Sequence, residues 1–226
     1  MLVSQMLPLY RMPFAKQVLK LDLVAYPDLP ALHEAYEEFS DSAGKYNKHI
    51  KLGGMKIFLD GSPQGRTAWM RTPYTGDAGE YGYGTMKDED VRAAFDEAAK
   101  RKIQLLAHCN GDAAAAQMIR CLAEEEKKYP VLRELKPVMI HAQLLGKDQI
   151  PEAVSLGIIA SFFAAHVYHW GDIHIKNFGM KRAAQISPAA TAMKTGLPFT
   201  FHQDSPVIQP DMLETIWCAV NRKTKK

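Results

Sequence analysis

Residues 103–122 read IQLLAHCNGDAAAAQMIRCL, and this stretch decides the fold. Its first part, residues 103–107, is an apolar run of strand length that ends at His108. After the turn residues NGD, apolar side chains recur at the spacing of one helix face. They are Ala115, Met118, Ile119 and Leu122. The stretch therefore predicts a strand followed by a helix, with a histidine where the strand ends.

The same unit recurs along the chain. Apolar runs of strand length occupy residues 21–26, 55–59, 103–107, 137–140, 157–163 and 198–201. A second helix face is predicted before residue 103, with Asp88 placed to cap the helix. Its apolar members are Val91, Ala94, Phe95, Ala98 and Ala99. Apolar strands that alternate with amphipathic helices indicate a parallel sheet with both faces covered, which is either a barrel or a doubly wound sheet.

The position of the polar residues favours the barrel. Each of them lies at or just after the end of an apolar run: Asp60, His108, His141, His166 and Asp204. Catalytic groups of barrel enzymes collect at that rim from several strands. No GxGxxG follows the first run and no P-loop occurs in the sequence. We therefore predict an α/β protein of the (β/α)8 TIM-barrel type. Because only six of the eight strands are recognised, we expect an incomplete barrel.

The amino-acid composition limits the kinds of partner that the protein is expected to bind. The 226 residues are 47% hydrophobic, which is enough for one substantial core. The net charge of +3 comes from 28 basic and 25 acidic residues that are interspersed, so no basic stripe suited to nucleic acid is present. Three cysteines are too few for a disulfide framework and fit a reducing, cytoplasmic setting. Arg11, Lys16 and Lys20 interrupt the apolar N-terminal segment, which argues against a signal peptide or a membrane span. We expect a small-molecule substrate.

His108 and His141 are the first candidate metal ligands. Each ends an apolar strand, in the strings LLAHCNGDAA and VMIHAQ. Histidine is a frequent ligand of zinc, and a catalytic site commonly offers three protein ligands and an open position. A single histidine after a strand is more often a hydrogen-bonded structural residue. Two on consecutive strands, followed by an aspartate at the last strand, favour a metal site, and we expect their nitrogens to share one ion.

Three further residues complete the candidate set, and each has a structural alternative. Asp204, in FTFHQDSPV, could bind metal and act as general base, or it could be a helix N-cap. Lys56 lies inside the apolar run GMKIFLDG, where it would carry a carbamate that binds metal; the structural alternatives are that it snorkels to solvent or forms an ion pair with Asp60. His166 could polarise a substrate carbonyl, or simply pack in a loop after residues 157–163.

Five strings carry a family resemblance: GMKIFLDGSPQGRTAWM, AHCNGDAAAAQ, IHAQ, ASFFAAHVYHWGD and FTFHQDSPVIQPDMLETIWCAVNRKT. Together they resemble the amidohydrolase superfamily, in the family 3 branch of metal-dependent hydrolases that includes N-substituted formamide deformylases. The family's ligands are an HxH pair on the first strand, a lysine or acidic residue on the fourth, histidines on the fifth and sixth, and an aspartate on the eighth. The resemblance assigns the last four roles to Lys56, His108, His141 and Asp204. It also implies one or two divalent ions, with zinc expected.

No HxH occurs in residues 1–226, and the strands of the family's small β-sandwich are also not found. We therefore expect a partial metal-dependent hydrolase barrel domain with weak activity. The first hypothesis is a hydrolase of non-peptide amide C–N bonds in which a metal-activated water attacks the carbonyl. Asp204 would move the proton, and His141 or His166 would stabilise the oxyanion. The second hypothesis is a non-catalytic barrel remnant that associates with another copy or another chain through exposed strand edges.

Overall fold

A computed structural model describes residues 20–226 and shows a five-stranded parallel sheet in the order β3-β4-β5-β6-β7. The strands are β3 (Gly54–Phe58), β4 (Gln104–Cys109), β5 (Val138–His141), β6 (Ile159–Phe162) and β7 (Phe199–Phe201). Each of these strands overlaps a predicted run, and the predicted parallel α/β class is confirmed. Arg11 and Lys16, on which the expectation about the N-terminal segment rests, lie outside the described residues.

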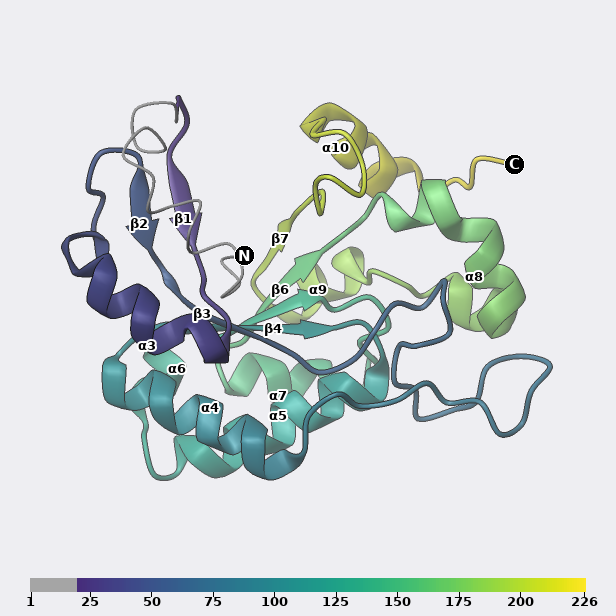
Figure 1. Ribbon diagram of the computed structural model, residues 1–226. Coiled ribbons are helices and arrows are strands. Elements are labelled where there is room, and N and C mark those ends of the chain that lie inside the picture. Colours follow the sequence, from purple (N-terminus) through teal and green to yellow (C-terminus); the bar gives the residue numbers. More distant parts are fainter. Residues whose placement is uncertain (1–19) are drawn as a thin grey trace.

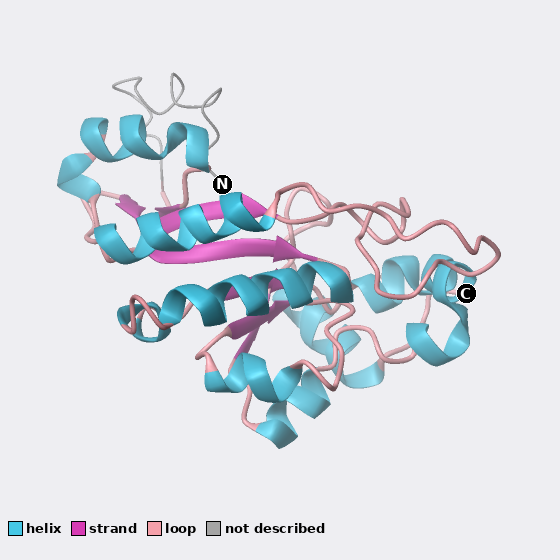
Figure 2. Ribbon diagram, turned by 90° about the horizontal axis from the view of Figure 1, so that it is seen from below, coloured by secondary structure: helices cyan, strands magenta, loops and turns pink. Residues whose placement is uncertain are grey.

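Helices cover one face of this sheet (Figures 1 and 2). They are α4 (Asp88–Arg101), α5 (Asp112–Glu126), α6 (Val131–Glu134) and α7 (Ile150–Ser155). All apolar residues predicted for the faces of α4 and α5 are buried, with exposures of 5% or less. The predicted cap is wrong, because Asp88 is the first residue of α4 and accepts hydrogen bonds from Arg120 and Gln117 of α5. These contacts join the two helices.

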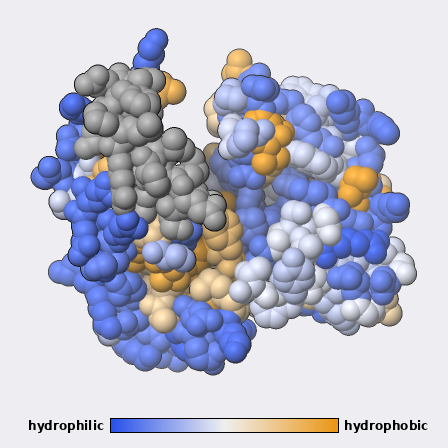
Figure 3. All heavy atoms as spheres, in the orientation of Figure 1, coloured by the Kyte–Doolittle hydropathy of each residue, from blue (hydrophilic) through white to orange (hydrophobic). Residues whose placement is uncertain are grey.

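The opposite face of the sheet is only half-buried, which corrects the expectation that both faces are covered. Residues that alternate toward the helices, such as Met55, Ile57 and Leu105, are 0–2% exposed. Those that alternate toward the inner face, such as Phe58 and Leu106, are partly exposed. Hydrophobic residues accordingly gather in the hollow between the two sides of the molecule in Figure 3. The physical reason is that β3 and β7, the two edge strands of this sheet in the described chain, do not pair with each other, so the sheet stays open and does not close into a ring.

The first predicted run forms β1 (Leu23–Ala25), but this strand pairs with β2 (Ile50–Leu52) in a separate two-stranded parallel sheet. The prediction missed β2. The segment that follows β1 runs alongside β3 and makes one isolated β-bridge with it. In this bridge the backbone N–H of Lys56 donates to Pro27 O at 2.9 Å. Pro27 has no N–H to donate, which breaks the ladder at this point. Gly54 is required at the start of β3, because a Cβ there would meet the carbonyl oxygen of Gln104 at 1.9 Å.

The remaining elements frame the ends of the sheet. α3 (Leu29–Glu38) and η2 (Ser40–Ser42) connect β1 to β2, and α9 (Ala189–Thr195) precedes β7. α8 (His166–Ala183) follows β6, and its turns are interrupted at Gly179, where φ is 73°. α10 (Met212–Asn221) follows β7 and begins at the N-cap Asp211. None of the helices in the described part of the chain is long and apolar enough to cross a membrane.

Candidate metal centre

Four histidines meet at the carboxyl edge of the sheet. His108 is the penultimate residue of β4, His141 is the last residue of β5, His202 follows β7, and His166 begins α8. The His141 ring is central: its centroid lies 4.5 Å from that of His108, 4.9 Å from that of His202 and 6.5 Å from that of His166. Parallel strands bring their carboxyl ends to the same edge, so residues distant in sequence become neighbours.

His141 reaches this edge through an unusual backbone conformation. In the ladder His141 pairs with Cys109, and the alternation of β5 would direct it toward the helices with Met139. Its φ of 70° lies in the left-handed region, which non-glycine residues seldom adopt. Because φ sets the direction of Cβ relative to the preceding strand, this conformation turns the imidazole into the cluster. Such strained positions concentrate at functional sites.

Three side chains form a set suited to a metal ion. The ligand atoms of His141, His202 and Asp204 all lie within 4.8 Å of one another. His202 Nε2 and His141 Nδ1 are 3.2 Å apart, about the separation of two nitrogens on one tetrahedral ion. The other nitrogen of His202 lies 2.9 Å from Ser161 Oγ, which fixes the orientation of the ring. Two imidazoles and a carboxylate are ordinary zinc donors, so these residues fit a divalent ion.

Burial keeps these imidazoles neutral and therefore able to bind a metal. It lowers the pKa of His202 to about 4, with the nearby Lys56 and His108 acting in the same direction. Burial also lowers the pKa of His141 well below its usual 6.5, and the neighbouring His108 and His202 add to this effect. At neutral pH each ring consequently offers a lone pair.

His108 lies beside His141 but directs Nε2 elsewhere. This nitrogen is 3.3 Å from the carbonyl oxygen of Gly61 and 3.1 Å from Asn110 Nδ2. Burial lowers the pKa of His108 to about 4. The structure thus brings together the two histidine rings proposed as joint ligands, whereas the three converging ligand atoms belong to His141, His202 and Asp204.

Asp60, which follows β3, holds the backbone of neighbouring loops at the carboxyl edge of the sheet. Its carboxylate accepts hydrogen bonds from the backbone N–H groups of Trp69, Asn110 and Gly111, at 2.7–3.0 Å, and lies 3.6 Å from His108 Nε2. Burial raises the pKa of Asp60 to about 7, against the lowering effect of these hydrogen bonds. The ion pair with Lys56, raised as the alternative role of that lysine, is therefore replaced by backbone contacts.

Lys56 faces the candidate site from the inner side of β3. Its neighbours Met55 and Ile57 are buried against the helices, in agreement with the alternation of a strand. The ammonium lies 5.2 Å from the centre of the Phe58 ring. Burial lowers the pKa of Lys56, while Asp204 acts in the opposite direction. The positive charge of Lys56 also contributes to lowering the pKa values of His141 and His202.

Asp204 does not cap a helix. The following helix, α10, begins eight positions later with Asp211 as its N-cap, which accepts hydrogen bonds from Leu213 N and Glu214 N. The φ of Asp204 is 54°, again in the left-handed region. Burial raises its pKa, and Lys56 lowers it. The metal-site interpretation of Asp204 therefore remains, and the capping alternative is wrong.

His166 lies in the first turn of α8 and not in a loop, but its ring packs against neighbours close in sequence, as the structural alternative expected. Its Nδ1 is 3.1 Å from His174 Nε2 in the same helix. Phe163 and Trp170 surround the His166 ring, with centroids at 4.5 Å and 5.0 Å. Sequence reasoning missed His174 and His202. The second of these had a usable signal, because His202 and Asp204 are two residues apart at the end of a strand.

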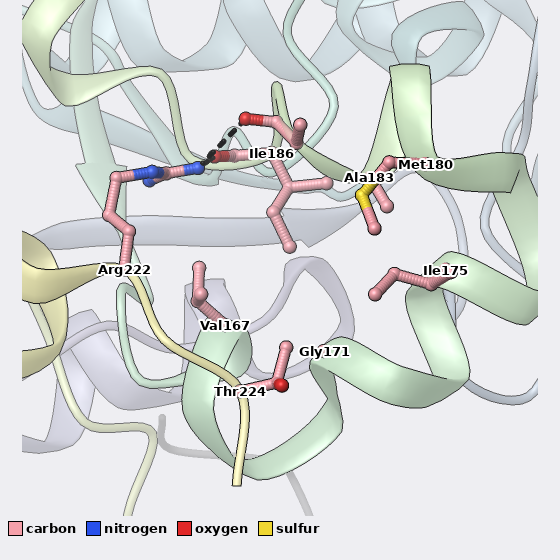
Figure 4. Close-up of a pocket in the computed structure, with 9 residues that line it drawn as sticks. Val167, Gly171, Ile175, Met180, Ala183, Ile186, Arg222 and Thr224 are labelled. Atoms are coloured by element: carbon pink, nitrogen blue, oxygen red, sulfur yellow. Dashed lines mark hydrogen bonds between the residues drawn. The ribbon is translucent and has the colours of Figure 1, made fainter. Parts of the chain in front are cut away.

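A separate cavity of about 460 Å³ lies away from this cluster, between α8 and the C-terminal segment (Figure 4). Apolar side chains, among them Ile175, Met180 and Ile186, line most of it. Arg222 lies at its edge, where its guanidinium donates to the carbonyl oxygens of Ala184, Ile186 and Ser187. Three of the guanidinium N–H groups are therefore used to hold the backbone of residues 184–187.

A parallel β/α sheet with imidazole and carboxylate groups converging at its carboxyl edge defines the class as a (β/α)-barrel protein with a candidate metal centre. Residues 5–226 match the model of the amidohydrolase family, and the chain belongs to this family. The family expectation drawn from the five sequence strings is thereby confirmed.

Among curated proteins, the chain is similar to "Putative amidohydrolase YtcJ" of Bacillus subtilis, with 27% identity over 195 residues. The match covers 85% of this chain and 36% of that protein. It is also similar to LONG AFTER FAR-RED 3 of Arabidopsis thaliana, with 28% identity over 174 residues that cover 76% of this chain and 30% of the relative. The chain thus spans about a third of the length of these relatives.

Two solved structures share the fold. They are uncharacterised metal-dependent hydrolases from Pyrococcus furiosus and Pyrococcus horikoshii, with TM-scores of 0.78 and 0.77 and identities of 23% and 24%. Both matches cover 92% of this chain, and they cover 42% and 41% of the respective structures. At this identity the likeness shows that the five-stranded sheet is part of a fold found in larger proteins.

Proposed function

We propose that this chain carries the metal centre of a hydrolase acting on carbon–nitrogen bonds of non-peptide amides. The observation that carries the proposal is the convergence of His141, His202 and Asp204 within 4.8 Å at the carboxyl edge of the sheet. We further propose zinc as the ion, because two neutral imidazoles and one carboxylate are donors that zinc accepts. Lys56 of β3 and His108 of β4 would lie next to the ion on the side opposite β7. The open inner face supports the view that residues 1–226 form a partial barrel domain.

A bound divalent ion supplies Lewis acidity, which makes water a nucleophile at neutral pH. The side chains then have separate tasks. Asp204 is half-buried with a raised pKa, so its carboxylate can accept a proton at an oxygen and pass it to the leaving nitrogen. His166, held neutral by burial, can donate a hydrogen bond to the developing oxyanion. Phe163 and Trp170 shield this part of the mouth from water.

Hydrolysis by the purified chain tests this function. We expect low but measurable turnover of formamides or N-acyl amines with added zinc, and little with simple esters. Because positioned proton transfer contributes roughly 100-fold or more, Asp204→Asn should reduce turnover by at least about that factor. His33→Ala is a matched control, since His33 is exposed on α3. Turnover that survives both chelation and Asp204→Asn would refute the proposal.

Lys56 is proposed to carry a carbamate. Burial lowers its pKa, which increases the fraction of neutral amine able to attack carbon dioxide. The new N–C bond forms as the nitrogen releases a proton to solvent, and the product is an anionic ligand. We expect intact-mass spectra in bicarbonate and zinc to show one added carbon dioxide. The adduct should be lost in Lys56→Arg and kept in Lys51→Arg, and an unmodified Lys56 under these conditions would reject this role.

The second candidate function is association with another copy of the chain, and the outer face of α10 favours it. Five apolar residues there are 43–79% exposed: Met212, Leu213, Ile216, Trp217 and Val220. A contiguous exposed apolar face of this kind commonly marks an interface. Sedimentation velocity should show self-association that the double variant Leu213→Glu, Val220→Glu abolishes. Met193→Glu, at an exposed position on α9, should leave it unchanged. A monomer at all concentrations would exclude this candidate.

We also propose a reducing compartment such as the cytoplasm as the setting. Cys109, Cys121 and Cys218 are all free and buried, which supports this proposal.

A further inference from the structure

The cavity between α8 and the C-terminal segment has the size of a small-molecule site. Its volume of about 460 Å³ falls in the range of about 300–1,000 Å³ that is usual for such sites. Most of its wall is apolar and comes from Val167, Ile175, Met180, Ala183, Ala184 and Ile186. None of the candidate metal ligands lines it. A ligand that fills this space must therefore be largely apolar.

The guanidinium of Arg222 forms the polar end of the cavity. It lies on one side of the space in Figure 4, and Ile175 and Met180 lie on the other. A guanidinium has five N–H groups, and three of those of Arg222 donate to carbonyl oxygens of residues 184–187. The N–H at Nε and one N–H at Nη1 form no hydrogen bond with the described residues. Arg222 therefore keeps two donors for a ligand.

The positive charge of Arg222 has no carboxylate partner among the described residues. Burial alone lowers the pKa of this guanidinium. Arg71 provides a contrast, because Asp148 and Asp112 form ion pairs with it and raise its pKa. Arg222 is still exposed enough for a ligand to reach it. An anion bound at this end would supply the partner that the charge lacks.

The surroundings of the cavity are also basic. The exposed charged residues that adjoin a lining residue in the chain are Lys176, Lys181, Lys223 and Lys225, against the single acidic residue Asp172. Such an excess of one sign of charge attracts ligands of the opposite sign. Both the local and the longer-range charges thus favour an anion.

We propose that this cavity binds a small carboxylate that carries an apolar chain, such as a medium-chain fatty acid. The carboxylate accepts a charge-assisted hydrogen bond from Nε or Nη1 of Arg222. The chain extends toward Ile175 and Met180 and leaves water for the apolar wall. This site is separate from the candidate metal centre, so the proposal does not depend on the proposed hydrolase function.

A titration with octanoate tests the proposal, with the protein isotope-labelled at the methionine methyl groups. We expect the methyl signal of Met180 to shift and saturate, and that of Met193, exposed on α9, to stay in place. Octanol has the same chain without the charge. It should bind at least about tenfold more weakly, because a hydrogen bond between two charged groups is lost. Equal binding of octanol, or no shift of Met180, would overturn the proposal.

Variants locate the ligand. Arg222→Gln should weaken octanoate binding at least about tenfold and leave octanol binding unchanged. Lys194→Gln is the matched control, since it removes the same charge at an exposed position on α9. Ala183→Leu places a larger side chain in the cavity and should weaken the binding of both probes.

Two results with the variants would contradict the proposal. One is an unchanged octanoate affinity in a folded Arg222→Gln protein. The other is a set of shifts confined to Met212, which would place the ligand on the exposed apolar face of α10 instead. If Arg222→Gln does not fold, the comparison of octanoate with octanol in the wild-type protein still decides.

Discussion

Replacing His202 with alanine should weaken zinc binding by at least about 100-fold, because changes even beyond the direct ligands of a metal cost 10–100-fold in affinity. His202 is one of the three residues whose ligand atoms converge, and its Nε2 lies 3.2 Å from His141 Nδ1. Calorimetric titration of the metal-stripped chain measures the affinity.

The control for this experiment is His33→Ala, which removes an exposed histidine on α3 and should leave the affinity unchanged. Thermal unfolding provides a second readout. Zinc at about 100 times its dissociation constant should stabilise the wild-type chain by about 2.7 kcal/mol, and this stabilisation should be lost in the His202 variant. Equal affinities of the variant and the wild type would show that His202 is not a ligand. The ligand set would then return to Lys56, His108, His141 and Asp204.

Acid should destabilise the metal-free chain steeply. Burial lowers the pKa of His108, His174 and His202 to about 4, and those of His141 and His166 well below the usual 6.5. The unfolded chain therefore binds more protons than the folded chain as the pH falls from about 6.5 toward 4. The contribution of these buried neutral histidines to the free energy of unfolding is complete above about pH 6.5, the usual pKa of histidine in an unfolded chain. It is lost as the pH falls from there toward 4.

Two carboxyl groups, those of Asp60 and Asp204, oppose this effect, because burial raises the pKa of each. Burial raises the pKa of Asp60 to about 7, so this carboxyl destabilises the fold at neutral pH, and protonation relieves the cost as the pH falls. The five histidines nevertheless outweigh the two aspartates. Between about pH 7.5 and pH 5.5 the net loss should be several kcal/mol, which is a large part of the stability of a typical domain.

Urea unfolding in the presence of a chelator, repeated across this pH range, measures the effect. The slope of the unfolding free energy against pH gives the number of protons taken up on unfolding. A flat profile would mean that the imidazole cluster is not held neutral by burial, and its readiness to bind metal would be in question.

Local sequence patterns determined the units of the fold. Apolar runs specified all five strands of the main sheet, and helical spacing specified the buried faces of α4 and α5, because both periodicities follow from backbone geometry within a few residues. The period of two also specified that Lys56 faces inward. The separate pairing of β1 with β2 was missed, since β2 has only three residues and its apolar–polar–apolar alternation is too short to recognise in the sequence.

For the candidate metal site, too, some features could be predicted from local sequence and others could not. The sequence alone determined that His108, His141 and Asp204 stand at strand ends, because a strand end is a local property. Only the tertiary structure decided which atoms converge. The left-handed backbone at His141 turns its ring away from the helix side, His108 directs Nε2 at Gly61, and β7 brings His202 beside His141. These outcomes depend on strand register and single backbone torsions, and contacts between residues dozens of positions apart select both.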